Sequence, residues 1–180
     1  MTLDGKRVVI VEDNKGLRDG FELLINASGK HQVVNTHESA ERALEALELD
    51  KPEIVLMDVN LPGINGIKCT HEIKKLRPKT EILIITVFEN STLVFDALCA
   101  GASGYLTKNS SPVEILSAID SAAMGGAPMS QHIARMVVDS FKKNSKTPLT
   151  VRETDILTLL SNGKSYATIA DNLNISKETV

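Results

Sequence analysis

Five polar side chains follow the apolar runs of the sequence and could carry out phosphoryl chemistry. Glu12 and Asp13 follow VVIV, Asp58 follows EIVLM, Thr86 ends EILIIT and Lys108 ends SGYLTK. A lone aspartate at such a place is a helix cap, a solvated loop group, a metal ligand or a nucleophile. Three carboxylates, a hydroxyl and an ammonium group together offer more, because they can hold both a hard cation and an oxyanion.

Transfer of a phosphoryl group to a carboxylate is the chemistry that this set favours. Converging carboxylates repel one another, so the site requires a cation, and Mg²⁺ accepts oxygen ligands while keeping several waters. Asp58 would then act as the nucleophile and form an aspartyl phosphate. Lys108 would balance the charge of the phosphoryl oxygens, and Thr86 would donate a hydroxyl hydrogen bond to one of them.

The elements that position these residues alternate along the first 124 residues. Short apolar runs predict strands, and helically spaced apolar residues with caps predict helices. The predicted strands are 8–11, 31–37, 53–57, 81–86 and 103–108, and the predicted helices are 14–27, 38–50, 66–76, 90–100 and 112–124. This alternation indicates a doubly wound parallel α/β sheet. Right-handed crossovers bring all five strand ends, and hence the five polar positions, to one edge.

Composition excludes several classes of protein. The 180 residues carry a net charge of −3 and 42% hydrophobic residues, and no apolar run approaches the length of a membrane span. The N-terminus lacks the pattern of a secretory signal. The histidines show no zinc spacing, and Cys69 and Cys99 fit small buried side chains in a reduced compartment. We therefore expect a cytoplasmic protein without a membrane partner.

The remaining residues indicate a linker and a small helical domain. Glycines and Pro128 interrupt the helical pattern after residue 124, one amphipathic helix is predicted at about 132–141, and a polar stretch follows. From Thr150 on, a capping box with Glu153 and two later turns predict three short helices, a pattern consistent with helix-turn-helix but shared by other helical hairpins. Residues 131–180 carry a formal charge of +2, which allows a nucleic-acid partner.

Residues 6–124 resemble the receiver domain of two-component response regulators, through VVIVED, VLMDVNLPGINGI, ITVF and GYLTK. The resemblance implies a flavodoxin-like fold with strand order 2-1-3-4-5 and a sensor histidine kinase as partner. It also implies a role for each matching position. The implied roles are the acidic metal pair Glu12 and Asp13, the phosphoacceptor Asp58, a backbone carbonyl ligand to Mg²⁺ at Asn60, the switch pair Thr86 and Tyr105, and the phosphoryl-contacting Lys108.

The last segment resembles the DNA-binding domain of the NarL/FixJ (LuxR-type) regulators, through LTVRE, NGKS and IADNLNISKETV. The implied division is a receiver at 1–124, a linker with one helix at 125–147, and the N-terminal part of a helix-turn-helix domain at 148–180. The implied function is phosphorylation-controlled transcription, with DNA as partner and a homodimer on activation. Lys177, Thr179 and Val180 are the candidate DNA contacts. Because the recognition helix has only begun at Val180, we expect this domain to be incomplete at its C-terminus and these 180 residues to show weak or no specific operator binding.

Two positions depart from the receiver pattern. Asn109 stands where many receivers have a proline with a cis bond, and a cis bond to a non-proline residue costs about 2.5–4 kcal/mol, so the conformation of that loop is open. Val87 stands where many receivers have a very small residue. We hypothesise that Val87 crowds the approach of water and prolongs the life of the phosphoryl group.

Other functions are weighed against the same residues. An aspartate-nucleophile phosphohydrolase of the haloacid-dehalogenase class would have a second aspartate where Asn60 stands. A flavin or nucleotide carrier would have a phosphate-binding loop after the first strand, where the acidic Glu12–Lys15 segment lies instead. The closer alternative is a receiver that acts only through protein contacts. We expect no enzyme beyond slow self-catalysed phosphorylation and dephosphorylation.

Overall fold

The computed structural model describes residues 5–87, 90–144, 155–156, 159, 166–173 and 175–176. The chain separates into two compact units, Met1–Ser140 and Phe141–Val180, and each is described by itself. None of the described helices is long and apolar enough to cross a lipid bilayer.

Strands and helices alternate through the first unit as the sequence predicts. They are β1 (Arg7–Val11), α1 (Lys15–Ala27), β2 (Gln32–His37), α2 (Ala40–Asp50), β3 (Ile54–Met57), α3 (Gly66–Leu76), β4 (Glu81–Thr86), α4 (Ser91–Cys99), β5 (Gly104–Thr107) and α5 (Pro112–Ala123). The strands pair in parallel in the order β2-β1-β3-β4-β5. The predicted doubly wound, five-stranded flavodoxin-like sheet is therefore confirmed.

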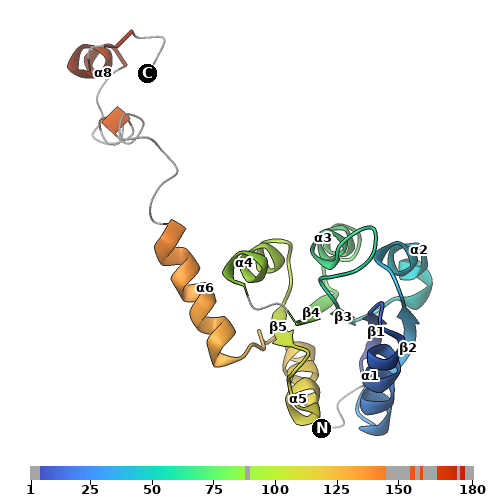
Figure 1. Cartoon of the computed structure of the whole chain (residues 1–180). Helices are drawn as coiled ribbons and strands as arrows, with labels where there is room; N and C mark the ends of the chain where they lie inside the picture. The colour runs from blue at the N-terminus through green and yellow to red at the C-terminus, as the bar shows by residue number, and fades with distance from the viewer. Residues whose placement is uncertain are drawn as a thin grey trace. The chain divides into compact units, whose positions relative to one another are not determined.

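Helices cover both faces of this sheet (Figure 1). Helices α1 and α5 lie on one face, and α2, α3 and α4 lie on the other. Successive strand residues alternate between the two cores, with Val9 and Ile84 in one and Ile10 and Ile85 in the other. Strand β3 is buried along its whole length, because both of its faces meet helices. The residues that end β3 consequently emerge at the centre of the sheet edge.

Side-chain caps fix where the helices begin and therefore how the loops at the carboxyl edge of the sheet run. The side chains of Asn14, Asn65 and Asn90 accept backbone N–H groups at the starts of α1, α3 and α4. Gly66 lies so close to the carbonyl oxygen of Asp58 that a Cβ there would overlap it. Only glycine therefore lets α3 begin directly beside the Asp58 loop.

Cysteine burial differs from the sequence expectation at one of the two positions. Cys69 is buried in the core between α2 and α3, as expected, but Cys99 is exposed. The interpretation of Cys99 as a buried side chain is wrong, because it lies at the end of α4 on the side turned away from the buried Val94 and Ala97.

A further helix, α6 (Gln131–Asn144), follows α5 where the linker was expected to hold one. It is longer than the predicted 132–141. The segment before it contacts β5, where the N–H of Tyr105 donates to the carbonyl of Pro128 at 3.0 Å. The start of α6 thus belongs to the first unit, whose compact part extends to Ser140.

The second unit contains α8 (Tyr166–Leu173), at the place of the second predicted helix of the C-terminal domain. Ile169 and Ala170 are buried, and the N–H of Ile175 donates to the carbonyl of Ala170 at 3.1 Å. Residues 155–156 and 159 are helical within the first predicted helix. The candidate DNA contacts Lys177, Thr179 and Val180 lie outside the described residues.

Candidate functional site

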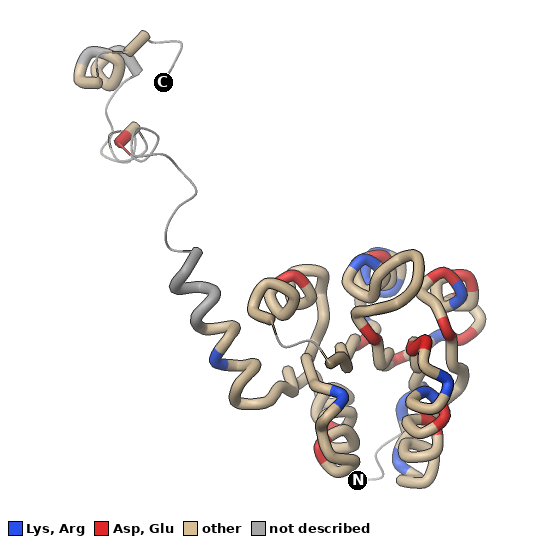
Figure 2. The backbone as a smooth tube through the Cα atoms, in the orientation of Figure 1, with Lys and Arg blue, Asp and Glu red and all other residues tan. Residues whose placement is uncertain are grey.

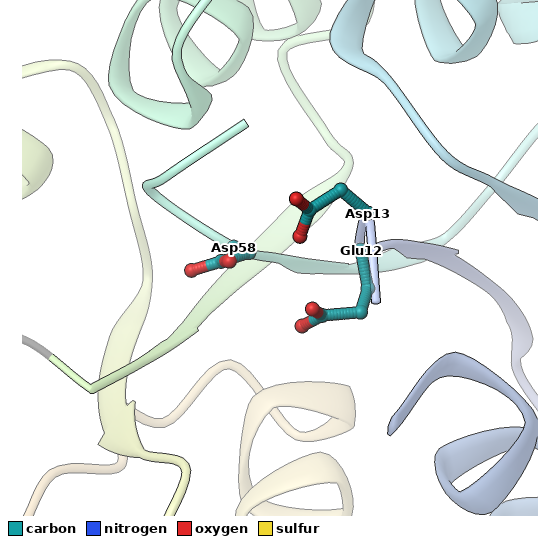
Figure 3. A group of neighbouring side chains, drawn as sticks. All are labelled: Glu12, Asp13 and Asp58. Atoms are coloured by element: carbon teal, nitrogen blue, oxygen red, sulfur yellow. The ribbon is translucent and has the colours of Figure 1, made fainter. Parts of the chain in front are cut away.

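Three acidic side chains meet at the carboxyl edge of the sheet (Figure 3). Glu12 and Asp13 follow β1 and Asp58 follows β3, and these two strands are neighbours. One carboxylate oxygen from each residue lies within 4.8 Å of the other two. Glu12 and Asp58 are buried, whereas Asp13 is exposed. The three form an acidic cluster that opens to solvent on the side of Asp13.

Lys108 enters this cluster from the end of β5. Its ammonium group lies 2.7 Å from Oε2 of Glu12 and 2.8 Å from Oδ2 of Asp58. Burial lowers the pKa of Lys108, but the hydrogen bonds to Asp58 and Glu12 outweigh it, and the pKa is raised. The Lys108–Asn109 bond is trans, as are all peptide bonds of the described residues. Lys108 thus reaches both carboxylates without a cis bond.

The cluster carries more negative charge than Lys108 balances. Burial raises the pKa of Glu12 above its ordinary value, and the ion pair with Lys108 offsets this only in part. The Oδ1 atom of Asp58 is buried and has no hydrogen-bond partner among the described residues. Because buried polar atoms are nearly always paired, this oxygen fits a ligand to a cation or a nucleophile. Three clustered carboxylates with one orphaned oxygen are a donor set suited to Mg²⁺.

Thr86 ends β4 beside this cluster, and its hydroxyl Oγ1 is buried and, within the described part of the chain, unpartnered. Tyr105 pairs with Ile84 in the parallel register, so it lies on the same face of the sheet as Ile84 and Thr86. Tyr105 is 0% exposed. The two predicted switch residues therefore lie on one face of the sheet, on the adjacent strands β4 and β5, with Thr86 two residues beyond the position opposite Tyr105.

Asn60 and Val87 are exposed, near Asp58 and Thr86 respectively. The roles given to them in the sequence analysis stay predictions. The same holds for the roles of Glu12, Asp13, Asp58, Thr86, Tyr105 and Lys108, which the geometry brings to one end of the sheet.

Two side chains that the sequence analysis did not single out hold the loops around the site. Arg18 donates to the carbonyl oxygen of Glu12 at 2.7 Å, which fixes the acidic loop from one turn into α1. The carboxylate of Glu41 accepts the N–H of Ile64 at 2.8 Å and so holds the loop after Asp58. The contact of Arg18 with Glu12 could have been predicted, because the two residues are only six positions apart. Nothing in the sequence connects Glu41 with Ile64.

Comparison with known families matches the two units separately. Residues 8–120 match the family described as "Response regulator receiver domain", and residues 147–180 match "Bacterial regulatory proteins, luxR family". Among curated proteins, the transcriptional regulatory protein YxjL of Bacillus subtilis is 32% identical over 100% of this chain and 86% of its own length. The nitrate/nitrite response regulator NarL of Escherichia coli is 31% identical over 96% of this chain and 83% of its own length.

Solved structures agree with these matches. A LuxR-family two-component response regulator from Aurantimonas has a TM-score of 0.72 and 34% identity, over 77% of this chain and 99% of that structure. RcsB from Salmonella enterica bound to a promoter has a TM-score of 0.69 over 97% of this chain and 86% of that one, and at 21% identity the likeness concerns the fold.

Proposed function

The chain belongs to the response-regulator family that joins a receiver domain to a LuxR-type DNA-binding domain, and from this premise we propose that phosphorylation of Asp58 controls its transcriptional output. A two-component response regulator of transcription is a regulatory protein rather than a typical enzyme. The observation that carries the proposal is the buried Oδ1 of Asp58, which has no hydrogen-bond partner in the described part of the chain and lies beside Lys108, Glu12 and Asp13.

Asp58 is the nucleophile in this proposal. One of its carboxylate oxygens attacks the phosphorus of a phosphohistidine on the partner kinase. The oxygen–phosphorus bond forms as the phosphorus–nitrogen bond breaks, and the freed imidazole nitrogen keeps the electron pair and takes up a proton. Oδ2 is held by Lys108 at 2.8 Å, which leaves Oδ1 as the oxygen free to react.

Lys108 and Thr86 stabilise the product. Three phosphoryl oxygens bring about −1.5 to −2 charges to the site at neutral pH. The ammonium group of Lys108 balances part of that charge from its present place between Asp58 and Glu12. The unpartnered hydroxyl of Thr86 becomes a donor to one phosphoryl oxygen, which gives this buried group the hydrogen bond that it lacks.

Glu12, Asp13 and Asp58 would hold Mg²⁺, together with the backbone carbonyl of Asn60 that the receiver resemblance implies. When bound, Mg²⁺ neutralises carboxylate and phosphoryl charge at the site. The exposed Asp13 lies on the open side of the cluster, where an ion and its waters can enter.

In this proposal Thr86 and Tyr105 transmit the effect of phosphorylation. Motion of Thr86 toward the phosphoryl oxygens leaves space on the sheet face that it shares with Tyr105, and Tyr105 shifts into that space. In this proposal residues 1–124 form the receiver, 125–147 the linker and 148–180 the DNA-binding part, where Lys177, Thr179 and Val180 contact DNA. A sensor histidine kinase, DNA and a second copy of the chain are the proposed partners.

The test is the intact mass of the chain after incubation with a small phosphodonor, with Mg²⁺ or with a chelator. We expect one phosphoryl adduct on the wild type in Mg²⁺, a strong reduction of the adduct in chelator, and none on Asp58→Asn. Asp19→Asn is a matched control, because Asp19 is an exposed aspartate that, among the described residues, pairs with the exposed Lys15. An adduct of equal yield on Asp58→Asn would contradict the proposal.

A further inference from the structure

The chain after α5 folds back onto the open edge of the sheet. Strand β5 is the last strand in the order and therefore has an edge that no other strand pairs with. Gly125, with a φ of +80°, turns the chain after α5. The N–H of Tyr105 then donates to the carbonyl of Pro128 at 3.0 Å, and Tyr105 forms a parallel bridge with Met129. Residues 128–129 thus act as a very short sixth strand on this edge.

The first turns of α6 fix this segment in place. Ser130 caps the helix, because its hydroxyl accepts the N–H of Ile133 at 3.2 Å and its carbonyl accepts the N–H of Ala134 at 2.9 Å. The cap orients the helix so that Ile133 is 0% exposed, whereas Val138 on the same helix is 49% exposed. Residues 127–138, which we name the linker clasp, are therefore bound to the receiver through one buried side chain and one strand-like contact.

The clasp is held by apolar contacts. Ile133 is in the same core as Tyr105 and Ile84, and Met129 and Met136 pack against that core. Charged residues gather on α1, α2 and α3, whereas α4, α5 and the start of α6 carry few of them (Figure 2). Contacts of this kind depend on close packing, so they weaken when a neighbouring side chain moves and leaves a void.

Tyr105 is the residue that the clasp and the phosphorylation site share. Its backbone bonds to Pro128 of the clasp, and its side chain lies in the same core as Ile133 and on the sheet face of Thr86. Gly104 beside it allows the close approach, because a Cβ there would lie 2.6 Å from the carbonyl oxygen of Pro128. If Tyr105 moved toward Thr86, the core against which Met129 and Ile133 pack would lose contacts.

We propose that the linker clasp is an intramolecular ligand of the receiver and that phosphorylation loosens it through Tyr105. The coupling rests on the proposed function, since it requires the phosphoryl group to draw Thr86 toward Asp58. Tyr105 then follows into the vacated space, the clasp loses packing, and residues 127–138 dissociate from the edge of β5 more often. Coupling between two sites is reciprocal, so a loosened clasp also favours the phosphorylated state. The clasp lies between the receiver and the DNA-binding segment in the sequence, so its release changes the length of free linker.

The amide hydrogen of Tyr105 reports directly on the clasp, because its bond goes to Pro128. Hydrogen exchange followed by NMR on the full chain compares it with the amide of Ser103, which donates to Ile82 in the neighbouring β4 at 2.8 Å. In the wild type with Mg²⁺ and a small phosphodonor, we expect exchange at Tyr105 to become about tenfold faster or more, with Ser103 unchanged. An adduct at Asp58 without any change at Tyr105 would overturn the coupling.

Variants test the clasp without phosphate. Ile133→Ala removes the buried anchor, and Val138→Ala is the matched control on the exposed face of the same helix. We expect Ile133→Ala to speed exchange at Tyr105 about tenfold in the absence of phosphodonor and to respond little to phosphorylation. Ser130→Ala, which removes only the cap, should shift exchange in the same direction by a smaller factor and covers the case that Ile133→Ala fails to fold.

The outcomes separate the two proposals. Equal exchange at Tyr105 in Ile133→Ala, Ser130→Ala and Val138→Ala contradicts the clasp, whatever happens at Asp58. Absence of an adduct on the wild type contradicts the proposed function and with it the coupling, while the unphosphorylated variants still decide whether residues 127–138 are bound as described.

Discussion

Charged groups are buried in two different ways in this molecule. The acidic cluster holds Glu12, Asp58 and Lys108, and it leaves Oδ1 of Asp58 and the hydroxyl of Thr86 without a partner among the described residues. At two other places a histidine pairs with an aspartate, and there both carboxylate oxygens of the aspartate accept hydrogen bonds. This difference indicates that the acidic cluster binds a ligand, whereas the histidine–aspartate pairs stabilise the fold.

His37 and Asp50 form the first such pair. Nε2 of His37 lies 2.7 Å from Oδ2 of Asp50, and the amide of Asn35 donates to Oδ1 at 3.0 Å, so that both oxygens are bonded. This network joins the end of α2 to β2. The backbone N–H of Glu12 donates to the carbonyl of His37 at 3.0 Å, but among the described residues neither side chain of this pair bonds to a carboxylate of the acidic cluster.

His31 and Asp120 form the second pair. Nδ1 of His31 accepts the N–H of Lys6 at 3.2 Å, which leaves the proton on Nε2 to be donated to Oδ1 of Asp120 at 2.9 Å. Lys30 donates to Oδ2 of the same carboxylate at 2.7 Å. Burial raises the pKa of Asp120, but the hydrogen bonds from Lys30 and His31 outweigh it, and the pKa is lowered. Glu12 shows the opposite direction, because burial dominates there.

The largest expected effect comes from Lys108→Ala in the acidic cluster. It leaves two buried carboxylates without their cation, and we expect a loss of about 3 kcal/mol of unfolding free energy in a chelator. Mg²⁺ supplies the missing charge, so millimolar Mg²⁺ should stabilise Lys108→Ala more than the wild type. Urea unfolding with and without Mg²⁺ measures this, with exposed Lys68→Ala as the control. Equal Mg²⁺ stabilisation of Lys108→Ala and the wild type would contradict the metal assignment.

Asp50→Ala should have the next largest effect and should behave differently. It leaves the largely covered His37 ring and the more exposed amide of Asn35 without their acceptor, and we expect a loss of about 2 kcal/mol that Mg²⁺ does not restore. Phosphorylation of Asp58 should remain, because among the described residues the side chain of Asp50 bonds only Asn35 and His37, and the backbone bond from Glu12 to His37 does not involve it. Urea unfolding and intact mass measure the two effects, and exposed Glu45→Ala on the same helix is the control. If Mg²⁺ restored the unfolding free energy of Asp50→Ala, the proposed difference between the acidic cluster and the histidine–aspartate pairs would be wrong.

The fold and the polar edge of the sheet were predictable, because each apolar run ends in a polar residue and parallel strands end at one edge. Glu12, Asp58 and Lys108 meet for that reason. The contacts of the linker were not predictable. The spacing of Ile133 and Val137 indicated an amphipathic helix, but no local signal tells which surface covers such a face. Pairs such as Asp50 with His37 depend on tertiary packing in the same way.

A smaller effect is expected from Asp120→Asn, and it depends on pH. The folded pKa of Asp120 lies below its ordinary value of 3.8, so the ion pair stabilises the wild type above that pH and the stability is lost as the pH falls through the folded pKa. We expect the variant to be about 1 kcal/mol less stable at pH 7, and the gap to close below about pH 4. Urea midpoints from pH 7 to pH 3 measure it. A gap that stays constant over this range would show that the charge of Asp120 is not the cause.

Val87→Ala should have the smallest effect, and on function alone. Val87 is 62% exposed at the end of β4, directly after Thr86, so its truncation opens no cavity and should change stability by less than about 0.5 kcal/mol. If Val87 crowds the water that attacks the phosphoryl group, Val87→Ala should lose that group about threefold faster, which corresponds to roughly 0.6 kcal/mol of barrier.

The decay of the adduct mass after removal of the phosphodonor measures this lifetime, with Val113→Ala on α5 as the control, since Val113 is also an exposed valine. Equal lifetimes in the two variants would assign the slow step to the acidic cluster itself. The exposed Val87 would then contribute neither to stability nor to chemistry, and the phosphoryl lifetime would depend on Lys108, which contacts the reacting carboxylate, and on the buried hydroxyl of Thr86.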